Sequence, residues 1–134
     1  MRKSLNVHYG EDFFSRFPNL YRVMWEDVPT CPLSERGGVE CGPGWKPVIE
    51  ELSAKLEALI LALPEPERRK CFAAQVKEKF GTLRFYMRGA TEEMRHEIGD
   101  AEGRTLSICH ACGAALPRRL SGCAECGGVG FGDE

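Results

Sequence analysis

The spacing of apolar residues predicts two helices in the first half of the chain. From Glu11 to Met24 apolar residues recur at intervals of three and four, which predicts a helix that Pro18 bends or restarts. A continuous apolar face from about Pro47 to Leu63 predicts the most regular helix, and its proline is tolerated in the first turn. Both helices therefore need an apolar partner on one side.

After residue 70 the apolar period changes to two, which predicts an amphipathic β-hairpin. The apolar face of this hairpin is expected to consist of Phe72, Ala74, Val76, Leu83, Phe85 and Met87. The opposite, polar face is expected to consist of Gln75, Lys77, Lys79, Arg84, Tyr86 and Arg88. Two strands alone are marginally stable, so the apolar face should pack on the helix of residues 47–63, with further strand pairing from residues that the pattern does not place.

A third helix is predicted after the hairpin. Thr91 suits its N-cap, and two glutamates follow in the first turn, where negative charge is favourable. Its apolar face is expected to hold Met94, Ile98, Ala101, Thr105 and Leu106. Residues 26–44 are rich in proline and glycine and predict a long irregular loop, a type of segment that often carries function. Together the elements predict an α+β fold with helices packed on a short antiparallel hairpin or sheet.

Four of the seven cysteines form two CxxCG units. Cys109 and Cys112 belong to the first, Cys123 and Cys126 to the second, and ten residues lie between Cys112 and Cys123. Each CxxC turn can offer two thiolates to one ion, and the glycine lets the backbone turn back with its amides directed at sulfur. Four thiolates complete a tetrahedron with no open position, which predicts a structural Zn²⁺ site.

Other interpretations of these cysteines stay open. Iron can occupy paired CxxCG turns, as in rubredoxin, because the ligand set does not choose between the two metals. Zinc is favoured because the segment lacks the aromatic-rich core that rubredoxin wraps around its iron. Redox disulfides would need a thioredoxin-like βαβ setting that this glycine-rich segment lacks. His110 could replace a cysteine as a ligand, although with four thiolates available we expect it to be a surface residue.

The length of 134 residues suits one compact domain with a metal-stapled appendage. We expect residues 1–106 to form the α+β domain and residues 107–134 to form a four-cysteine zinc ribbon. The odd number of cysteines and the absence of an apolar leader or of about twenty consecutive apolar residues predict a reducing, cytoplasmic setting. Cys31, Cys41 and Cys71 are expected to be small buried residues.

The formal net charge of −2 conceals a basic middle. Residues 61–90 have a net charge of +4, against −2 for residues 1–60 and −4 for residues 91–134. A polar strand face that combines cations with an aromatic ring could follow a phosphate backbone and stack a base. The candidate nucleic-acid-binding residues are Lys77, Lys79, Arg84, Tyr86 and Arg88. Two plainer explanations stay open: a solvated sheet face, or a basic middle covered by the acidic last third.

Patterns typical of catalysis are scarce. Cys41, in the string ECGPGW, could act as a nucleophile if the fold brings a base such as His8 or His96 to it. Trp45, at the start of the long helix, is expected to be a core anchor. The sequence contains no phosphate-binding glycine loop, nucleophile elbow or HExxH helix. Binding is therefore favoured over catalysis.

Three strings together resemble a known family. ECG with a following tryptophan at residues 40–45, VKEKFGTLRFY at residues 76–86 and CHACG at residues 109–113 are similar to strings in largely uncharacterised small proteins of bacteriophages and prophages. The resemblance implies a bacterial or phage-infected cytoplasm and supplies no established activity. Some members have only the first CxxCG unit, so the resemblance does not extend to the second.

By analogy with small phage accessory proteins, we expect a zinc-binding, non-enzymatic protein that binds a host or defence-system protein. The long loop of residues 26–44 and the zinc ribbon would form its docking surface. Nucleic-acid binding by the hairpin face is the alternative, and an enzyme with a site centred on Cys41 is the second alternative.

Overall fold

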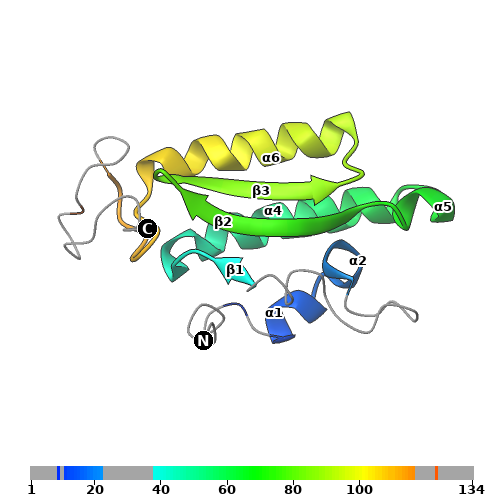
Figure 1. The fold of residues 1–134 in the computed structure, drawn as a ribbon, viewed down its shortest axis with the longest axis horizontal. Helices are drawn as coiled ribbons and strands as arrows, with labels where there is room; N and C mark the ends of the chain where they lie inside the picture. Colours follow the sequence, from blue (N-terminus) through cyan, green and yellow to red (C-terminus); the bar gives the residue numbers. More distant parts are fainter. Residues whose placement is uncertain (1–8, 10, 23–37, 117–122, 124–134) are drawn as a thin grey trace.

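The computed structural model has an α+β fold in which helices cover one face of a three-stranded mixed sheet (Figure 1). The structure describes residues 9, 11–22, 38–116 and 123. Its elements are α1 (Glu11–Ser15), α2 (Pro18–Tyr21), β1 (Val39–Glu40), η2 (Pro43–Trp45), α4 (Lys46–Leu61), α5 (Glu65–Arg68), β2 (Phe72–Lys79), β3 (Thr82–Arg88), α6 (Glu92–Arg104) and η3 (Thr105–Ser107). The predicted α+β class is confirmed.

Proline sets the bounds of the first helices. The predicted helix of residues 11–24 is divided into α1 and α2, and Pro18 is the first residue of α2. The long predicted helix is α4, which begins one residue before Pro47 and ends at Leu61 rather than Leu63. The short helix α5, in the charged segment after α4, was not predicted.

The third predicted helix is α6, and its cap is confirmed. Thr91 is the N-cap residue, and its Oγ1 accepts a hydrogen bond from the Met94 N–H at 3.2 Å. The prediction that Leu106 belongs to its apolar face is wrong, because Leu106 is exposed. The reason is that the α-helix changes to the tighter turn η3 at Thr105, which rotates the following side chain away from the helix stripe.

β2 and β3 form the predicted antiparallel hairpin, while β1 pairs in parallel with the other side of β2. The prediction of a purely antiparallel sheet is therefore wrong at β1. The same strand shows that residues 26–44 are not irregular throughout, although residues 26–37 lie outside the described residues. Val39 of β1 is fully buried opposite Val76, but a strand of two residues has no periodicity to recognise.

A β-bulge in β2 corrects the predicted apolar face of that strand. The pairing with β3 shifts between Ala73 and Gln75, so that Ala73 rather than Ala74 shares the buried face with Val76. Phe72 and Ala74, predicted on the buried face, are only half-buried. An extra residue reverses the alternation on one side of the bulge, which a strict period of two cannot anticipate.

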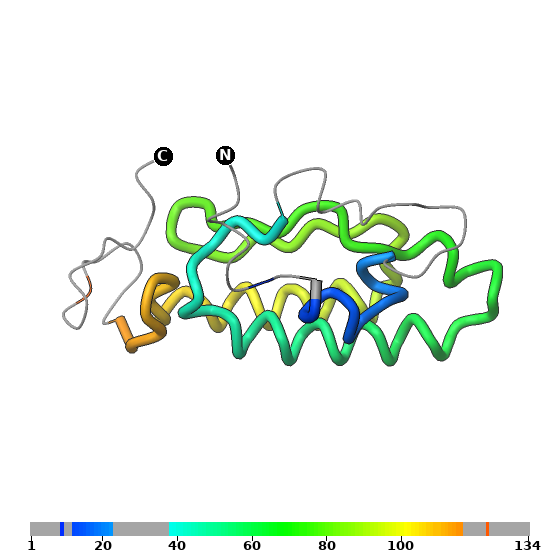
Figure 2. Tube along the Cα trace, turned by 90° about the horizontal axis from the view of Figure 1, so that it is seen from below, coloured from blue at the N-terminus to red at the C-terminus, as the bar shows by residue number. Residues whose placement is uncertain are grey.

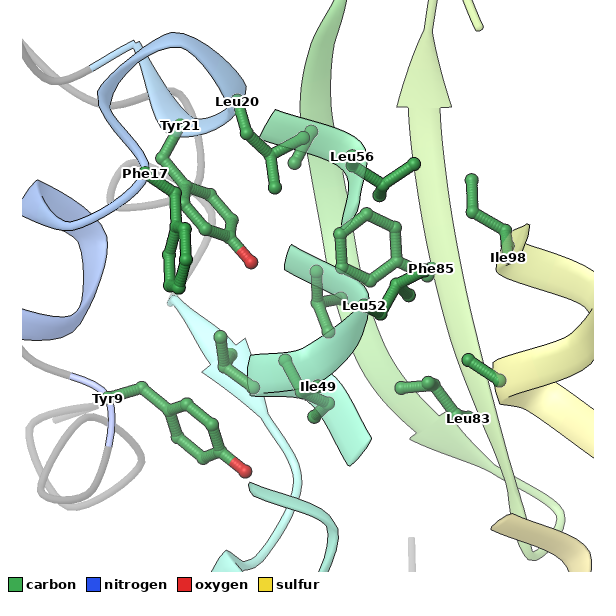
Figure 3. Packing of buried hydrophobic residues seen from close by; sticks show 14 of the residues in the cluster. Tyr9, Phe17, Leu20, Tyr21, Ile49, Leu52, Leu56, Leu83, Phe85 and Ile98 are labelled. Carbon is green, nitrogen blue, oxygen red and sulfur yellow. The ribbon is translucent and has the colours of Figure 1, made fainter. Parts of the chain in front are cut away.

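The core lies between the sheet and a layer formed by α4 and α6, which run side by side in opposite directions (Figure 2). Figure 3 shows Leu52 and Leu56 of α4 beside Phe85 of β3, with Ile98 of α6 and Leu20 of α2 on either side. No described helix lies over the other side of the sheet (Figures 1 and 2). We call that side the outer face.

A buried carboxylate fixes α2 to α4. Glu57 of α4 is 9% exposed, and its oxygens accept hydrogen bonds from the Leu20 N–H at 2.9 Å and from the backbone and side-chain amides of Asn19 at 3.2 and 2.8 Å. The backbone donors belong to the first turn of α2, where N–H groups have no partner within a helix. Glu57 therefore caps α2 from another element.

Replacing Glu57 by glutamine is expected to lower the free energy of unfolding by about 1–3 kcal/mol. Glutamine has the same size as glutamate, but its side-chain NH₂ group is a donor. It would face the N–H groups of Asn19 and Leu20 and leave some of them without an acceptor. Glu51→Gln, at an exposed position of the same helix, is the control and should change that free energy by less than about 0.5 kcal/mol. Urea denaturation of both variants makes the comparison, and equal stabilities would show that Glu57 does not hold α2.

Candidate functional site

Three cysteine sulfurs converge beyond the C-terminal end of α6. The Sγ atoms of Cys109, Cys112 and Cys123 lie within 4.8 Å of one another, and those of Cys112 and Cys123 are 3.6 Å apart. Sulfurs bound to zinc at about 2.3 Å in a tetrahedron are about 3.8 Å apart, so the spacing suits a shared ion. None of the three is in a disulfide. These residues could hold a metal ion, and the fourth predicted ligand, Cys126, lies outside the described residues.

Residues 109–113, the cysteine turn, fold back on themselves through their backbone. The Gly113 N–H donates to the Cys109 carbonyl at 2.7 Å, and the Cys109 N–H donates to the Ala114 carbonyl at 2.8 Å. Gly113 has a φ of 88°, a conformation that favours glycine over residues with a Cβ. The glycine of the CxxCG unit thus closes the turn that brings its thiols together.

Residues 42–45 pack directly against the cysteine turn. The Gly42 N–H donates to Nδ1 of His110 at 3.0 Å, and the Gly44 N–H donates to the His110 carbonyl at 2.7 Å. A Cβ built on Gly44 would lie 2.1 Å from the Cys109 carbonyl oxygen. Only glycine permits such a close approach of two backbones. The glycines around Pro43 therefore serve the contact with the candidate metal site.

Trp45 and His110 extend this contact. Trp45 is fully buried, which confirms the expected core anchor, and its Nε1–H donates to the Ile108 carbonyl at 2.8 Å. His110, expected at the surface, is half-buried: its ring lies 5.3 Å from the Trp45 ring between centroids, and its Nδ1 is an acceptor. These contacts join both sides of the predicted domain boundary at residue 106, which itself stays a prediction.

Cys41 has the environment of a buried structural thiol. It is 7% exposed, and burial raises the pKa of its thiol, to which the charges of Glu78 and Glu40 add. A thiol that stays protonated is a poor nucleophile. His96 is exposed on α6, and His8 lies outside the described residues. The described part of the chain thus gives the enzyme alternative no support.

The candidate nucleic-acid-binding residues share the outer face of the hairpin. They are Lys77, Lys79, Arg84, Tyr86 and Arg88. Lys77 lies opposite Arg84 across the two strands, and Tyr86 lies opposite Gln75. Side chains at alternate strand positions share one face, so the register aligns the cations with the ring. Tyr86 is 46% exposed, Lys79 and Arg88 are exposed, and Lys77 and Arg84 are half-buried.

Two further observations bear on this basic face. Nε of Arg84 is buried without a hydrogen-bond partner among the described residues, a costly state for a guanidinium donor. The acidic residues of the last third that the structure describes all belong to α6, which lies on the helical side of the sheet (Figure 2). Within the described residues, the acidic third therefore does not cover the basic face.

The hairpin tip holds an aromatic residue that the sequence analysis did not single out. Phe80 and Gly81 form the two-residue turn, with φ values of 53° and 80°, as in a type I′ turn. For a residue other than glycine this conformation costs about 1–2 kcal/mol. Phe80 is 56% exposed, and Nζ of Lys79 lies 5.6 Å from the centroid of its ring. In the sequence, the position of Phe80-Gly81 between two segments of alternating apolar and polar residues could have indicated a phenylalanine in the turn.

Comparison with known proteins finds no match to this chain among protein-family models, curated proteins or solved structures. No helix in the described part of the chain combines the length and the apolar character needed to cross a membrane.

Proposed function

We propose that this protein binds nucleic acid through the basic outer face of its hairpin. The observation that supports this most is the cross-strand register, which aligns Lys77 and Arg84 with Tyr86 on the side of the sheet that no described helix covers. Cationic side chains can contact phosphates, and an exposed ring can stack on a base.

We further propose that the metal is zinc and that Cys126 completes a four-thiolate site with Cys109, Cys112 and Cys123. The support is the convergence of the three described sulfurs and the place of the fourth cysteine in a second CxxCG unit. Four thiolates around zinc keep no position for water, so the ion would order the C-terminal segment and take no part in a reaction. Iron with the same ligands is the competing assignment.

A host or defence-system protein as partner, and an origin in a phage or prophage, remain predictions. Residues 26–37 of the predicted docking loop and most of the predicted ribbon lie outside the described residues. The basic face carries the proposal because the strand register places its cationic and aromatic side chains on one surface of the sheet.

Fluorescence anisotropy with a labelled DNA strand tests the proposal. Wild-type protein is expected to bind, with an affinity that decreases as salt rises, because phosphate contacts release condensed cations. Lys77→Ala combined with Arg84→Ala should weaken binding and reduce the log-log salt slope by about 0.7 for each lost phosphate contact. Lys55→Ala with Arg104→Ala removes equal charge from the helical side and serves as the control.

Two results would contradict the proposed nucleic-acid interface. One is the absence of binding at low salt. The other is equal weakening by the two double variants, which would indicate a general effect of net charge rather than contacts on the outer face.

A further inference from the structure

The hairpin tip exposes a large aromatic ring in an unfavourable backbone conformation. Phe80 is 56% exposed, more than any other large apolar side chain among the described residues. Its φ of 53° is adopted more readily by glycine or asparagine, and Asn-Gly is the favoured pair in a type I′ turn. The geometry of the turn therefore does not account for a phenylalanine at this position.

Cationic side chains flank the ring. Lys77, Glu78, Lys79 and Phe80 line a hollow of about 250 Å³ at the tip. Oε2 of Glu78 accepts a hydrogen bond from the Gly81 N–H at 2.9 Å, so this carboxylate is directed at the backbone of the turn. The two lysines thus supply positive charge beside an exposed aromatic surface, a combination that suits the phosphate and the base of a nucleotide.

We infer that the ligand of the basic face is a single strand and that Phe80 stacks on one of its bases while Lys77 and Lys79 contact adjacent phosphates. This inference rests on the proposed function. Bases in a duplex stack on one another, whereas the bases of a single strand can place their faces on protein rings. Tyr86 lies on the same hairpin, roughly 13 Å along β3 from Thr82 at 3.3 Å per residue, so a strand that follows β3 would pass both rings.

Phe80→Asn removes the aromatic ring without destabilising the fold, because asparagine suits the turn better than phenylalanine. We expect this variant to melt at a higher temperature than wild type. It should bind a fluorescein-labelled thymidine strand of about 15 nucleotides at least fivefold more weakly. The salt slope should stay unchanged because the phosphate contacts remain.

Two matched variants complete the experiment. Phe80→Trp keeps an aromatic ring and should retain the affinity for the strand within about twofold. Leu61→Asn removes another exposed apolar side chain, 50% exposed at the end of α4, and should leave the affinity unchanged. Anisotropy titrations of all variants are run with the strand and with a duplex of the same length.

The outcomes distinguish the inference from the proposed function. Equal affinity of wild type and Phe80→Asn for the strand would overturn the stacking role and leave the basic face intact. Tighter binding to the duplex than to the strand would overturn the assignment of a single-stranded ligand. Failure of wild type to bind either would overturn the proposed function together with the inference.

Discussion

Replacing Cys112 by serine is expected to abolish metal binding and to unfold the segment after residue 106, while the helices and hairpin before it stay folded. The effect is large because a structural zinc site of this kind contributes on the order of 10 kcal/mol to folding at neutral pH. Apart from the hydrogen bonds that residues 42–45 donate to Ile108 and His110, the segment has little other support, since its described buried cluster consists of Cys109, Leu116 and Cys123. Two of these three are proposed ligands, so packing alone cannot hold the segment. Cys126→Ser should have the same effect.

Hydrogen exchange measured by mass spectrometry checks this result. Amides of residues 107–116 should lose protection in the Cys112→Ser variant, and in wild type after chelation, while α4, β2 and β3 keep theirs. Cys71→Ser is the control, because this buried thiol donates to the Gly89 carbonyl at 3.1 Å and a serine hydroxyl can do the same. Loss of protection along the whole chain in one step would contradict the predicted division at residue 106.

Replacing Gly44 by alanine is expected to lower the free energy of unfolding by about 1–3 kcal/mol or more, and to weaken metal binding by about 10- to 100-fold. The added Cβ would lie 2.1 Å from the Cys109 carbonyl oxygen and 2.4 Å from the Gly113 nitrogen. Both are backbone atoms, which cannot rotate away as a side chain can. The cysteine turn would have to move, which breaks the bond from Gly44 to His110 and displaces a proposed ligand.

Two glycines of α6 provide the matched control. A Cβ on Gly99 or Gly103 would meet nothing within 4 Å, so alanine there should raise the free energy of unfolding by about 0.5–1 kcal/mol through better helix propensity. Urea denaturation gives the stabilities, and competition with a zinc chelator gives the metal affinities. If Gly44→Ala matched wild type in both stability and metal affinity, the close contact with the cysteine turn would not exist.

The longer elements were predictable because each has a repeated pattern of burial. Helix α4 buries one stripe over several turns, and β3 buries Leu83 and Phe85 at alternate positions. The candidate metal ligands were predictable for a different reason, since a CxxCG unit fixes the distance between its two thiols through a short backbone turn. In both cases the local sequence is sufficient to predict the feature.

Features that depend on contacts between distant segments were not predictable. The bulge at Ala74 is one inserted residue in an otherwise regular strand, and β1 is too short to show a period. The packing of residues 42–45 on the cysteine turn joins positions more than sixty residues apart, as in the bond from Gly42 to His110. The glycines that permit it looked like ordinary loop residues, because nothing nearby in the sequence indicates which backbone approaches them.

The proposed four-cysteine zinc centre is tested most directly by native mass spectrometry of protein purified in the presence of zinc. The expected result is one zinc ion bound to each wild-type chain and none bound to Cys112→Ser. A wild-type chain without metal, or a Cys112→Ser chain that keeps one zinc ion, would contradict the assignment.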